Sequence, residues 1–189
     1  MQLITSLFLA LSMLFGGNDA AKAPVAKKPG SATYPKADDA KLTWLTIEQA
    51  QELNKKKPRK IFVDVYTDWC GWCKRMDKTT FSHPEVVKYL NANYYAVKMN
   101  AEQTENIIFK NQVYKFNAGQ NSHDLAVSLL NGQMSFPTTV YLDEKLNVLS
   151  PVPGYLTAPE FLKLLNFYGQ NKHKKQSFEE FSKVYKSDI

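Results

Sequence analysis

The pattern of apolar and polar positions predicts alternating helices and strands from about Trp44 onward. The stretch TIEQAQELNKKK carries apolar residues at helical spacing, with Thr46 and Gln49 in the positions of a capping box and Pro58 beyond its end. The next run, KIFVDVYT, is short, β-branched and aromatic, and it lies between helix-breaking residues. That run predicts a buried strand.

The same alternation continues downstream. KRMDKTTF favours a helix from about Gly71, and SHPEVVKYLNAN favours another, with Ser82 as its cap and Pro84 in its first turn. YYAVKMNA predicts the next strand, and TTVYLDEKLNVLSPVPG predicts a β-hairpin that turns at 143–145. APEFLKLLNFYGQ and SFEEFSKVYK predict two closing helices. A β-α-β unit implies a parallel pair and a short turn an antiparallel pair, so we expect an α/β fold with a mixed central sheet flanked by helices.

The segment 102–135 is longer than a simple connection between two strands. It is mostly polar, and its pattern predicts helix, with a break near Gly119 and a second short helix from Leu125 to Leu130. We therefore expect an inserted helical segment ahead of the hairpin.

The first part of the chain has a different composition. An apolar run from Leu3 to Phe15 has the length of a signal-peptide core, and Ala21 and Ala23 form an A-x-A cleavage pattern. Residues 1–23 are therefore expected to be a signal peptide, 24–43 a flexible linker and 44–189 one folded domain. An uncleaved membrane anchor is the alternative. The predicted location is exported, periplasmic or otherwise extracytoplasmic, where disulfides persist.

Charge points to no particular ligand. The chain has 24 Lys and Arg against 18 Asp and Glu, a net charge of +6, but the surplus is scattered in short runs. Such runs are typical of solvated helix ends, and we expect no nucleic-acid binding. The sequence also has no glycine-rich phosphate loop.

The chain has two cysteines, Cys70 and Cys73, in the stretch TDWCGWCKRM. At the start of a predicted helix, free N–H groups and the helix dipole favour a Cys70 thiolate. Cys73 lies one turn further on the same face, so it can resolve a mixed disulfide formed at Cys70. A purely structural disulfide would close a loop too short to stabilise the fold much.

A metal site is the other alternative. A closed zinc site needs four ligands, so two more would have to come from the three histidines, which show no paired spacing. We interpret His83 as a residue near a helix start and His123 as a surface residue beside Asp124. A copper- or zinc-binding module therefore stays open as an alternative to a redox pair.

The stretch FVDVYTDWCGWCKRM resembles the active-site segment of the thioredoxin superfamily, closest to exported thioredoxin-like proteins with a D-W-C-x-W-C-K motif. The resemblance runs from about Lys60 to Gly154. Asp64, six residues before the first cysteine, matches the family's buried aspartate. Lys98 in AVKMN matches the lysine that accompanies this aspartate, and Pro137 in SFPTT matches the cis-proline.

The resemblance implies a thioredoxin fold and a thiol–disulfide oxidoreductase that acts on protein disulfides. The implied catalytic residues are Cys70, Cys73, Asp64 and Lys98, with no metal and no organic cofactor besides the redox-active cysteine pair. A buried Asp64 would accept the proton of Cys73, and Lys98 would temper the rise of its pKa. The presence of both Asp64 and Lys98 favours a reductase; a disulfide oxidase or isomerase of the same fold is the alternative.

The implied substrate-binding residues surround the cysteines: Trp69, Gly71, Trp72, Phe136 and Pro137. We expect Trp69 to pack under the active-site loop and Trp72 to be exposed beside the thiols. The Gly71-Trp72 pair replaces the Gly-Pro of cytosolic thioredoxins, so no reduction potential carries over. Partners are expected to be proteins with disulfides or thiols and, for a reductase, a membrane electron donor, with the chain itself a monomer.

Overall fold

The structure is a computed structural model that describes residues 41–187 and 189. The predicted signal peptide and residues 24–40 of the predicted linker lie outside the described residues. Among the residues that are described, no helix is both long enough and apolar enough to cross a membrane.

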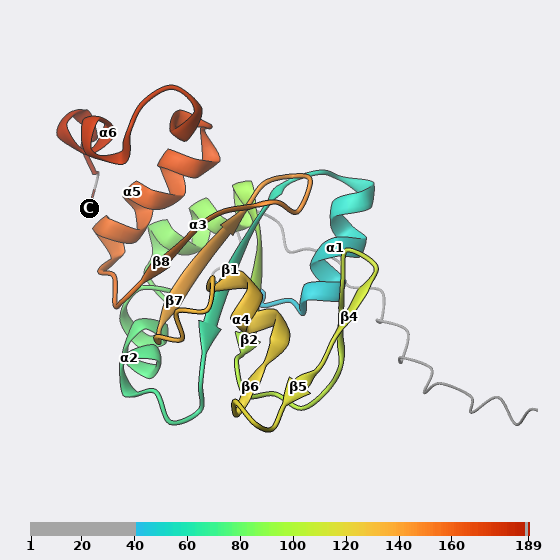
Figure 1. Cartoon of the computed structure of the whole chain (residues 1–189). Helices are drawn as coiled ribbons and strands as arrows, with labels where there is room; N and C mark the ends of the chain where they lie inside the picture. The colour runs from blue at the N-terminus through green and yellow to red at the C-terminus, as the bar shows by residue number, and fades with distance from the viewer. Residues whose placement is uncertain (1–40, 188) are drawn as a thin grey trace, which may run out of the picture.

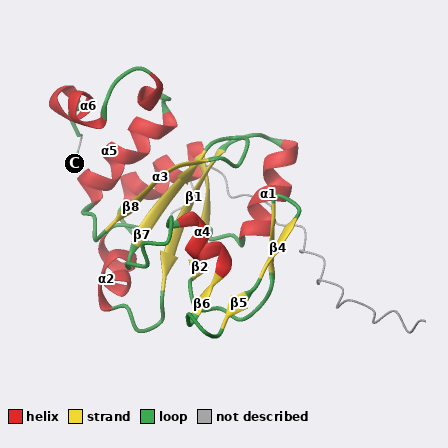
Figure 2. Cartoon of the chain, in the orientation of Figure 1, coloured by secondary structure: helices red, strands yellow, loops and turns green. Residues whose placement is uncertain are grey.

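The elements of the domain fall into three groups along the chain (Figures 1 and 2). The elements of the main layers are α1 (Ile47–Lys56), β1 (Lys60–Tyr66), α2 (Gly71–Thr79), α3 (Pro84–Asn93), β2 (Tyr94–Asn100), β7 (Thr138–Leu142), β8 (Val148–Pro153) and α5 (Ala158–Gly169). The elements between β2 and β7 are β3 (Ile107–Phe109), β4 (Gln112–Tyr114), β5 (Phe116–Asn117), β6 (Ser122–His123) and α4 (Asp124–Leu129). A 3₁₀ turn η1 (Lys172–Lys174) and α6 (Phe178–Val184) follow α5.

The four main strands form one mixed sheet in the order β2-β1-β7-β8. β1 and β2 are parallel, whereas β7 is antiparallel to both β1 and β8, which confirms the predicted sheet. β8 lies at an edge of the sheet and contains Pro151 and Pro153. Proline has no N–H to donate, so an edge strand is the place where a sheet tolerates it.

The two faces of the sheet bury separate cores. Alternate side chains of β1 point to opposite faces. Ile61 and Val63 pack with residues of α1 and α4, whereas Phe62 packs with Met76 of α2 and with residues of α3 and α5. In Figure 1, α4 crosses in front of the sheet and α3 runs behind it. The helices therefore cover both faces, as predicted.

The helix expected over the first part of segment 102–135 is wrong. This part forms two small antiparallel pairs, β3 with β4 and β5 with β6, and only α4 matches the predicted second helix. β3 and β4 are joined by Lys110 and Asn111, which both have positive φ, 51° and 64°. Positive φ at both central residues is the geometry of a two-residue type I′ hairpin turn.

The helix starts agree with the sequence at α1 but not at α3. The Thr46 hydroxyl accepts the Gln49 N–H at 3.2 Å and the Gln49 side chain accepts the Thr46 N–H at 2.9 Å, which confirms the capping box. The Ser82 cap of α3 is wrong: the N-cap is His83, and the Ser82 hydroxyl donates to the Lys78 carbonyl instead. Pro84, as the first residue of α3, needs no capping partner.

Candidate active site

The two cysteines lie where the loop after β1 becomes α2. Cys70 is the N-cap residue of α2 and is joined to Cys73 by a disulfide. The Cys73 N–H donates to the Cys70 Sγ at 3.0 Å, and the Cys70 N–H donates to the Thr67 carbonyl at 3.2 Å. The Cys70 sulfur therefore receives an N–H of the first helical turn, where negative charge is stabilised.

Exposure does not distinguish the two cysteines. Cys70 is 4% exposed and Cys73 is 3% exposed. Their positions do distinguish them, because Cys70 precedes the helix and Cys73 lies within it. A Cβ at Gly71 would meet no described atom within 4 Å beyond its chain neighbours and the backbone of its own helix, so the approach to the helix start is open at this residue.

Asp64 lies on the same side of the sheet as α2. It is two residues after Phe62 on β1, so both point to one face. Phe62 packs with Met76, and Cys73 is one helical turn before Met76 on the same side of α2. The sheet alternation and the helix period therefore place the Asp64 carboxyl and Cys73 on facing sides of β1 and α2.

Asp64 is a buried carboxyl with a single charged neighbour on the next strand. It is 1% exposed, and β1 and β2 pair so that it lies opposite Lys98, whose Nζ is 3.2 Å from the Asp64 Oδ2. Burial raises the pKa of Asp64 to about 6, while Lys98 opposes the rise. The Asp64 Oδ1 has no hydrogen-bond partner among the described residues, so one oxygen is free to accept a proton.

Lys98 is held by a second carboxylate and by aromatic rings. Its amino group also pairs with Asp77 of α2. It lies 4.8 Å from the ring centre of Trp44 and 5.1 Å from that of Tyr66, distances at which a cation is attracted to the ring face. Sequence reasoning missed Asp77, although its position four residues after Cys73 puts it on the same face of α2.

Pro137 is brought to the cysteines by the antiparallel pairing of β7 with β1. Thr138, the first residue of β7, pairs with Val65 near the end of β1, so Pro137 lies at the edge of the sheet from which the cysteine loop leaves. The Phe136–Pro137 peptide bond is cis. The Pro137 carbonyl accepts the N–H of Gly154 at 2.8 Å, so the turn after β8 is tied to this edge.

Trp69 corrects one expectation. It does not pack under the loop but is 67% exposed, with its ring centre 5.9 Å from that of Phe136 in an edge-on arrangement. Its indole N–H donates to the Glu102 Oε1 at 3.0 Å. The carboxylate of Glu102 thus provides a hydrogen-bond acceptor for the indole at the surface. Sequence reasoning missed Glu102, which carries no motif.

Trp72 is exposed, as expected, at 56%. Its ring centre lies 5.5 Å from that of Tyr155, and the Arg75 guanidinium lies 5.3 Å from the Trp72 ring and 5.8 Å from the Tyr155 ring. Tyr155, which follows β8, was also missed from the sequence. The loop and both ends of the β7–β8 hairpin thus present aromatic rings around the disulfide.

His123 is not a surface residue. It is fully buried at the start of α4, where its Nδ1 accepts the Leu125 N–H at 3.2 Å and its Nε2 lies 3.1 Å from the Glu105 carbonyl oxygen. His83 is the N-cap residue of α3, as expected for a residue near a helix start. Within the described part of the chain, no three His, Cys, Asp or Glu side chains gather so that they could hold a metal ion.

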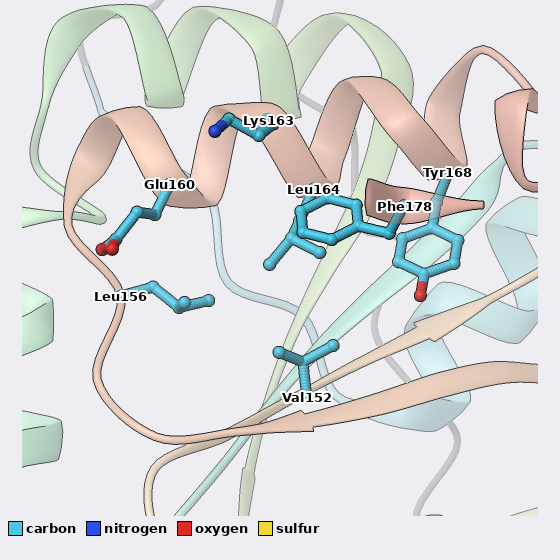
Figure 3. Close-up of a pocket in the computed structure, with 7 residues that line it drawn as sticks. All are labelled: Val152, Leu156, Glu160, Lys163, Leu164, Tyr168 and Phe178. Carbon is cyan, nitrogen blue, oxygen red and sulfur yellow. The ribbon is translucent and has the colours of Figure 1, made fainter. Parts of the chain in front are cut away.

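A hollow of about 390 Å³ lies away from the cysteines, between β8, α5 and the start of α6 (Figure 3). Most of the side chains around it are apolar, and one acid and one base lie on α5: Val152, Leu156, Glu160, Lys163, Leu164, Tyr168 and Phe178. None of the predicted site residues lines it. The candidate active site is therefore the exposed surface around the disulfide and not this hollow.

Comparisons with known proteins agree with this geometry. Over 136 residues the chain is 30% identical to the thiol:disulfide interchange protein DsbD of Haemophilus ducreyi, and over 141 residues it is 30% identical to DsbD of Cronobacter sakazakii. These matches cover 71% and 74% of this chain but only 21% of each relative, so the chain matches about a fifth of the length of these relatives.

Solved structures share the fold. A DsbH oxidoreductase matches with a TM-score of 0.52 at 17% identity, covering 77% of this chain and 95% of that one. A thioredoxin from Thermus thermophilus matches with a TM-score of 0.52 at 21% identity, covering 77% of this chain and 98% of that one. The family model described as a thioredoxin-like domain matches residues 47–169, and the chain belongs to that thioredoxin-like family.

Proposed function

We propose that this protein is a thiol–disulfide oxidoreductase that acts on disulfides of other proteins. The observation that carries the proposal is the position of Cys70, at the start of α2 with its sulfur accepting a helix N–H and bonded to Cys73. A static disulfide of this spacing would stabilise the fold little. A reversible disulfide uses the helix N–H to stabilise the Cys70 thiolate and uses Cys73 to resolve the mixed disulfide.

The reaction conserves two electrons and two protons. In the reduced protein the Cys70 thiolate attacks one sulfur of a substrate disulfide, forms a mixed disulfide and expels the other substrate sulfur as a thiolate. Cys73 then loses its proton and attacks the Cys70 sulfur. The Cys70–Cys73 disulfide forms, the second substrate sulfur leaves, and the two substrate thiolates take up protons. The cysteine pair is oxidised and the substrate is reduced.

Asp64 and Lys98 serve the second step. Asp64 takes the proton from Cys73, directly or through water, because its raised pKa lets it hold a proton near neutral pH. Lys98 keeps this pKa from rising further, so that the carboxyl is still partly ionised and able to accept. The reaction calls for no metal and no organic cofactor.

Partner proteins would dock over the residues that surround the disulfide. Trp69 and Trp72 are exposed, and Phe136 is partly buried beside Trp69, so all three offer apolar surface. The open space at Gly71 leaves room for a substrate disulfide to approach Cys70. Pro137 brings the backbone before it to the cysteine edge, where a substrate segment can pair in an extended form.

The favoured direction of the reaction is reduction of the substrate disulfide, with electrons supplied by a membrane donor. We also propose that the chain is exported and acts as a monomer. The combination of Asp64 and Lys98 supports this direction. Equilibration with glutathione checks it: a potential near about −270 mV indicates a reductase, and one near about −120 mV an oxidant.

The experiment that tests the activity is reduction of insulin coupled to dithiothreitol. The wild type is expected to accelerate insulin precipitation, and Cys70→Ser is expected to return the rate to that of dithiothreitol alone. An unchanged rate in Cys70→Ser would rule the proposal out. Titration of the reduced protein with Zn²⁺ and Cu⁺ separates it from a metal-binding module, since tight binding at the thiols favours the latter.

A further inference from the structure

The inserted segment between β2 and β7 is attached directly to the active-site loop. The Ala101 N–H donates to the Tyr66 carbonyl at 2.8 Å, and the His123 N–H donates to the Ala101 carbonyl at 2.7 Å. The Asn100 side chain donates to the Asp68 carboxylate at 3.0 Å. Three hydrogen bonds thus join the start of the segment to His123 and to the residues just before the cysteines.

The attachment continues in a chain of side chains that ends at Trp69. The Glu102 Oε1 accepts the Trp69 indole N–H at 3.0 Å and the Asn121 amide N–H at 3.2 Å. The Glu102 backbone N–H donates to the Asn100 Oδ1 at 2.9 Å. Asn121 has a φ of 46°, a left-handed conformation that asparagine tolerates well. Asn100 therefore holds the backbone of Glu102 and Asn121 holds its carboxylate, which in turn accepts the indole N–H of Trp69.

These contacts restrict an otherwise exposed ring. Trp69 leaves two thirds of its surface exposed beside the attacking cysteine, and a free surface indole would sample several rotamers. The bond to Glu102 and the edge-on contact with Phe136 hold it in one. A fixed aromatic side chain is the kind of residue that contributes most to protein interfaces, because its ordering cost is already met before binding.

We infer that Glu102, held by Asn121, is a positioning residue that fixes Trp69 as part of the docking surface for protein substrates. The inserted segment thereby sets affinity for partners with an apolar side chain beside the reacting cysteine, without acting on the sulfur chemistry. The inference rests on the proposed function. It assigns a role to the inserted segment, which is longer than a simple connection between two strands.

The test compares protein and small-molecule disulfides in steady-state kinetics of the full-length chain. Glu102→Ala is expected to raise KM for insulin about threefold to tenfold, the factor that loss of one hydrogen bond produces, with kcat nearly unchanged. The rate with hydroxyethyl disulfide stays the same, because that substrate is too small to need the indole. Glu102→Gln keeps an oxygen acceptor and stays near wild type.

Two further variants sharpen the test. Glu105→Ala removes the same charge from an exposed position on the same segment but leaves the Glu102 carboxylate that accepts the indole N–H, and is expected to leave both substrates unaffected. Asn121→Asp keeps a residue that tolerates positive φ but places a second carboxylate beside Glu102, and is expected to raise KM for insulin as Glu102→Ala does.

The indole N–H signal of Trp69 in ¹⁵N NMR spectra gives a readout that does not depend on activity. Glu102→Ala is expected to shift this signal and to speed its exchange with solvent, while Glu105→Ala leaves it unchanged. An unperturbed Trp69 signal in Glu102→Ala overturns the inference, and so does an equal loss of rate with both disulfides. If wild type and Cys70→Ser are equally inactive on insulin, the proposed function fails instead, and with it the docking role.

Discussion

Two lysine–carboxylate pairs on strand β1 have opposite electrostatic outcomes. At the first residue of the strand the Lys60 Nζ lies 2.6 Å from the Glu144 Oε1, and four residues on the Asp64 Oδ2 lies 3.2 Å from the Lys98 Nζ. In the first pair the lysine is buried, at 3% exposure, and the carboxylate is 41% exposed. In the second pair the carboxylate is buried, at 1% exposure, and the lysine is 21% exposed.

The difference shows that the burial of the carboxylate decides the direction in which its pKa shifts. Burial acts to raise the pKa of Glu144, but the hydrogen bond from Lys60, a backbone hydrogen bond and the charge of Lys60 together outweigh it, so this pKa is lowered. Burial of Asp64 outweighs the attraction of Lys98, so the pKa of Asp64 rises to about 6. Only the second pair holds a group that exchanges protons near neutral pH, and it faces the helix that carries the cysteines.

The largest expected effect comes from neutralising Asp64, with neutralisation of Glu144 as the matched control. Asp64→Asn is expected to slow insulin reduction at pH 7 by about a hundredfold, because Cys73 loses its proton acceptor. Glu144→Gln is expected to stay near wild type, since that pair lies at the other end of β1. Similar rates for the two variants would show that Asp64 has no part in proton transfer.

Asp64 and Glu144 should make the free energy of unfolding of the oxidised protein depend on pH in opposite ways. Because the pKa of Asp64 rises on folding, the native state binds its proton more tightly than the unfolded chain does. The resulting stability is full below the unfolded pKa of 3.8 and is lost as pH rises through about 6. At about 1.4 kcal/mol per pKa unit, wild type should lose about 3 kcal/mol over this interval relative to Asp64→Asn.

Glu144 should show the reverse dependence. Its pKa is lowered on folding, so its contribution is present above the unfolded pKa of 4.5 and is lost as pH falls below it. Urea denaturation of wild type, Asp64→Asn and Glu144→Gln at a series of pH values measures both. A constant difference between wild type and Asp64→Asn across this range would contradict a raised pKa.

Removing the lysine of each pair should move the pH profile of the reaction in one case only. Lys98→Met is expected to raise the pKa of Asp64 above about 6, since the attraction that opposes burial is lost. The pH–rate profile of insulin reduction then shifts to higher pH. Lys60→Met is the matched control and is expected to leave the midpoint where it is. A shift of equal size in both variants would point to a general effect on folding.

The smallest effect is expected from Asp77. Its negative charge is the weakest of the causes that set the pKa of Asp64, and it raises that pKa. Asp77→Asn is therefore expected to shift the pH–rate profile slightly to lower pH, in the direction opposite to Lys98→Met. A shift to higher pH would show that Asp77 acts mainly by holding Lys98 in place.

The sequence predicted the parts of the site that depend on regular secondary structure. The run KIFVDVYT and the helix start at Gly71 place Asp64 and the cysteines, and parallel pairing of β1 with β2 brings Lys98 opposite Asp64. These positions follow from alternation along strands and from the helix period, which are local properties. The mixed sheet was therefore expected from the order of the elements, whereas the buried carboxyl of Asp64 was expected from the resemblance to the thioredoxin superfamily.

The contacts made by the inserted segment were not predictable in the same way. The strands of IIFKNQVY are only three residues long, and their Lys110-Asn111 turn lacks the glycine that marks most type I′ turns. Trp69 was expected to pack under the active-site loop, but its indole N–H donates to Glu102, 33 residues away. Neither residue type nor spacing reveals a contact at that separation.

The most direct test of the central claim is to trap the mixed disulfide and identify the cysteine that carries it. Cys73→Ser leaves Cys70 able to attack but removes the resolving thiol, so it is expected to accumulate a covalent adduct with insulin, mapped by mass spectrometry to Cys70. Cys70→Ser is expected to form no such adduct under the same conditions. Adduct formation through Cys73, or equal trapping by both variants, would contradict the roles that the start of α2 assigns to the two cysteines.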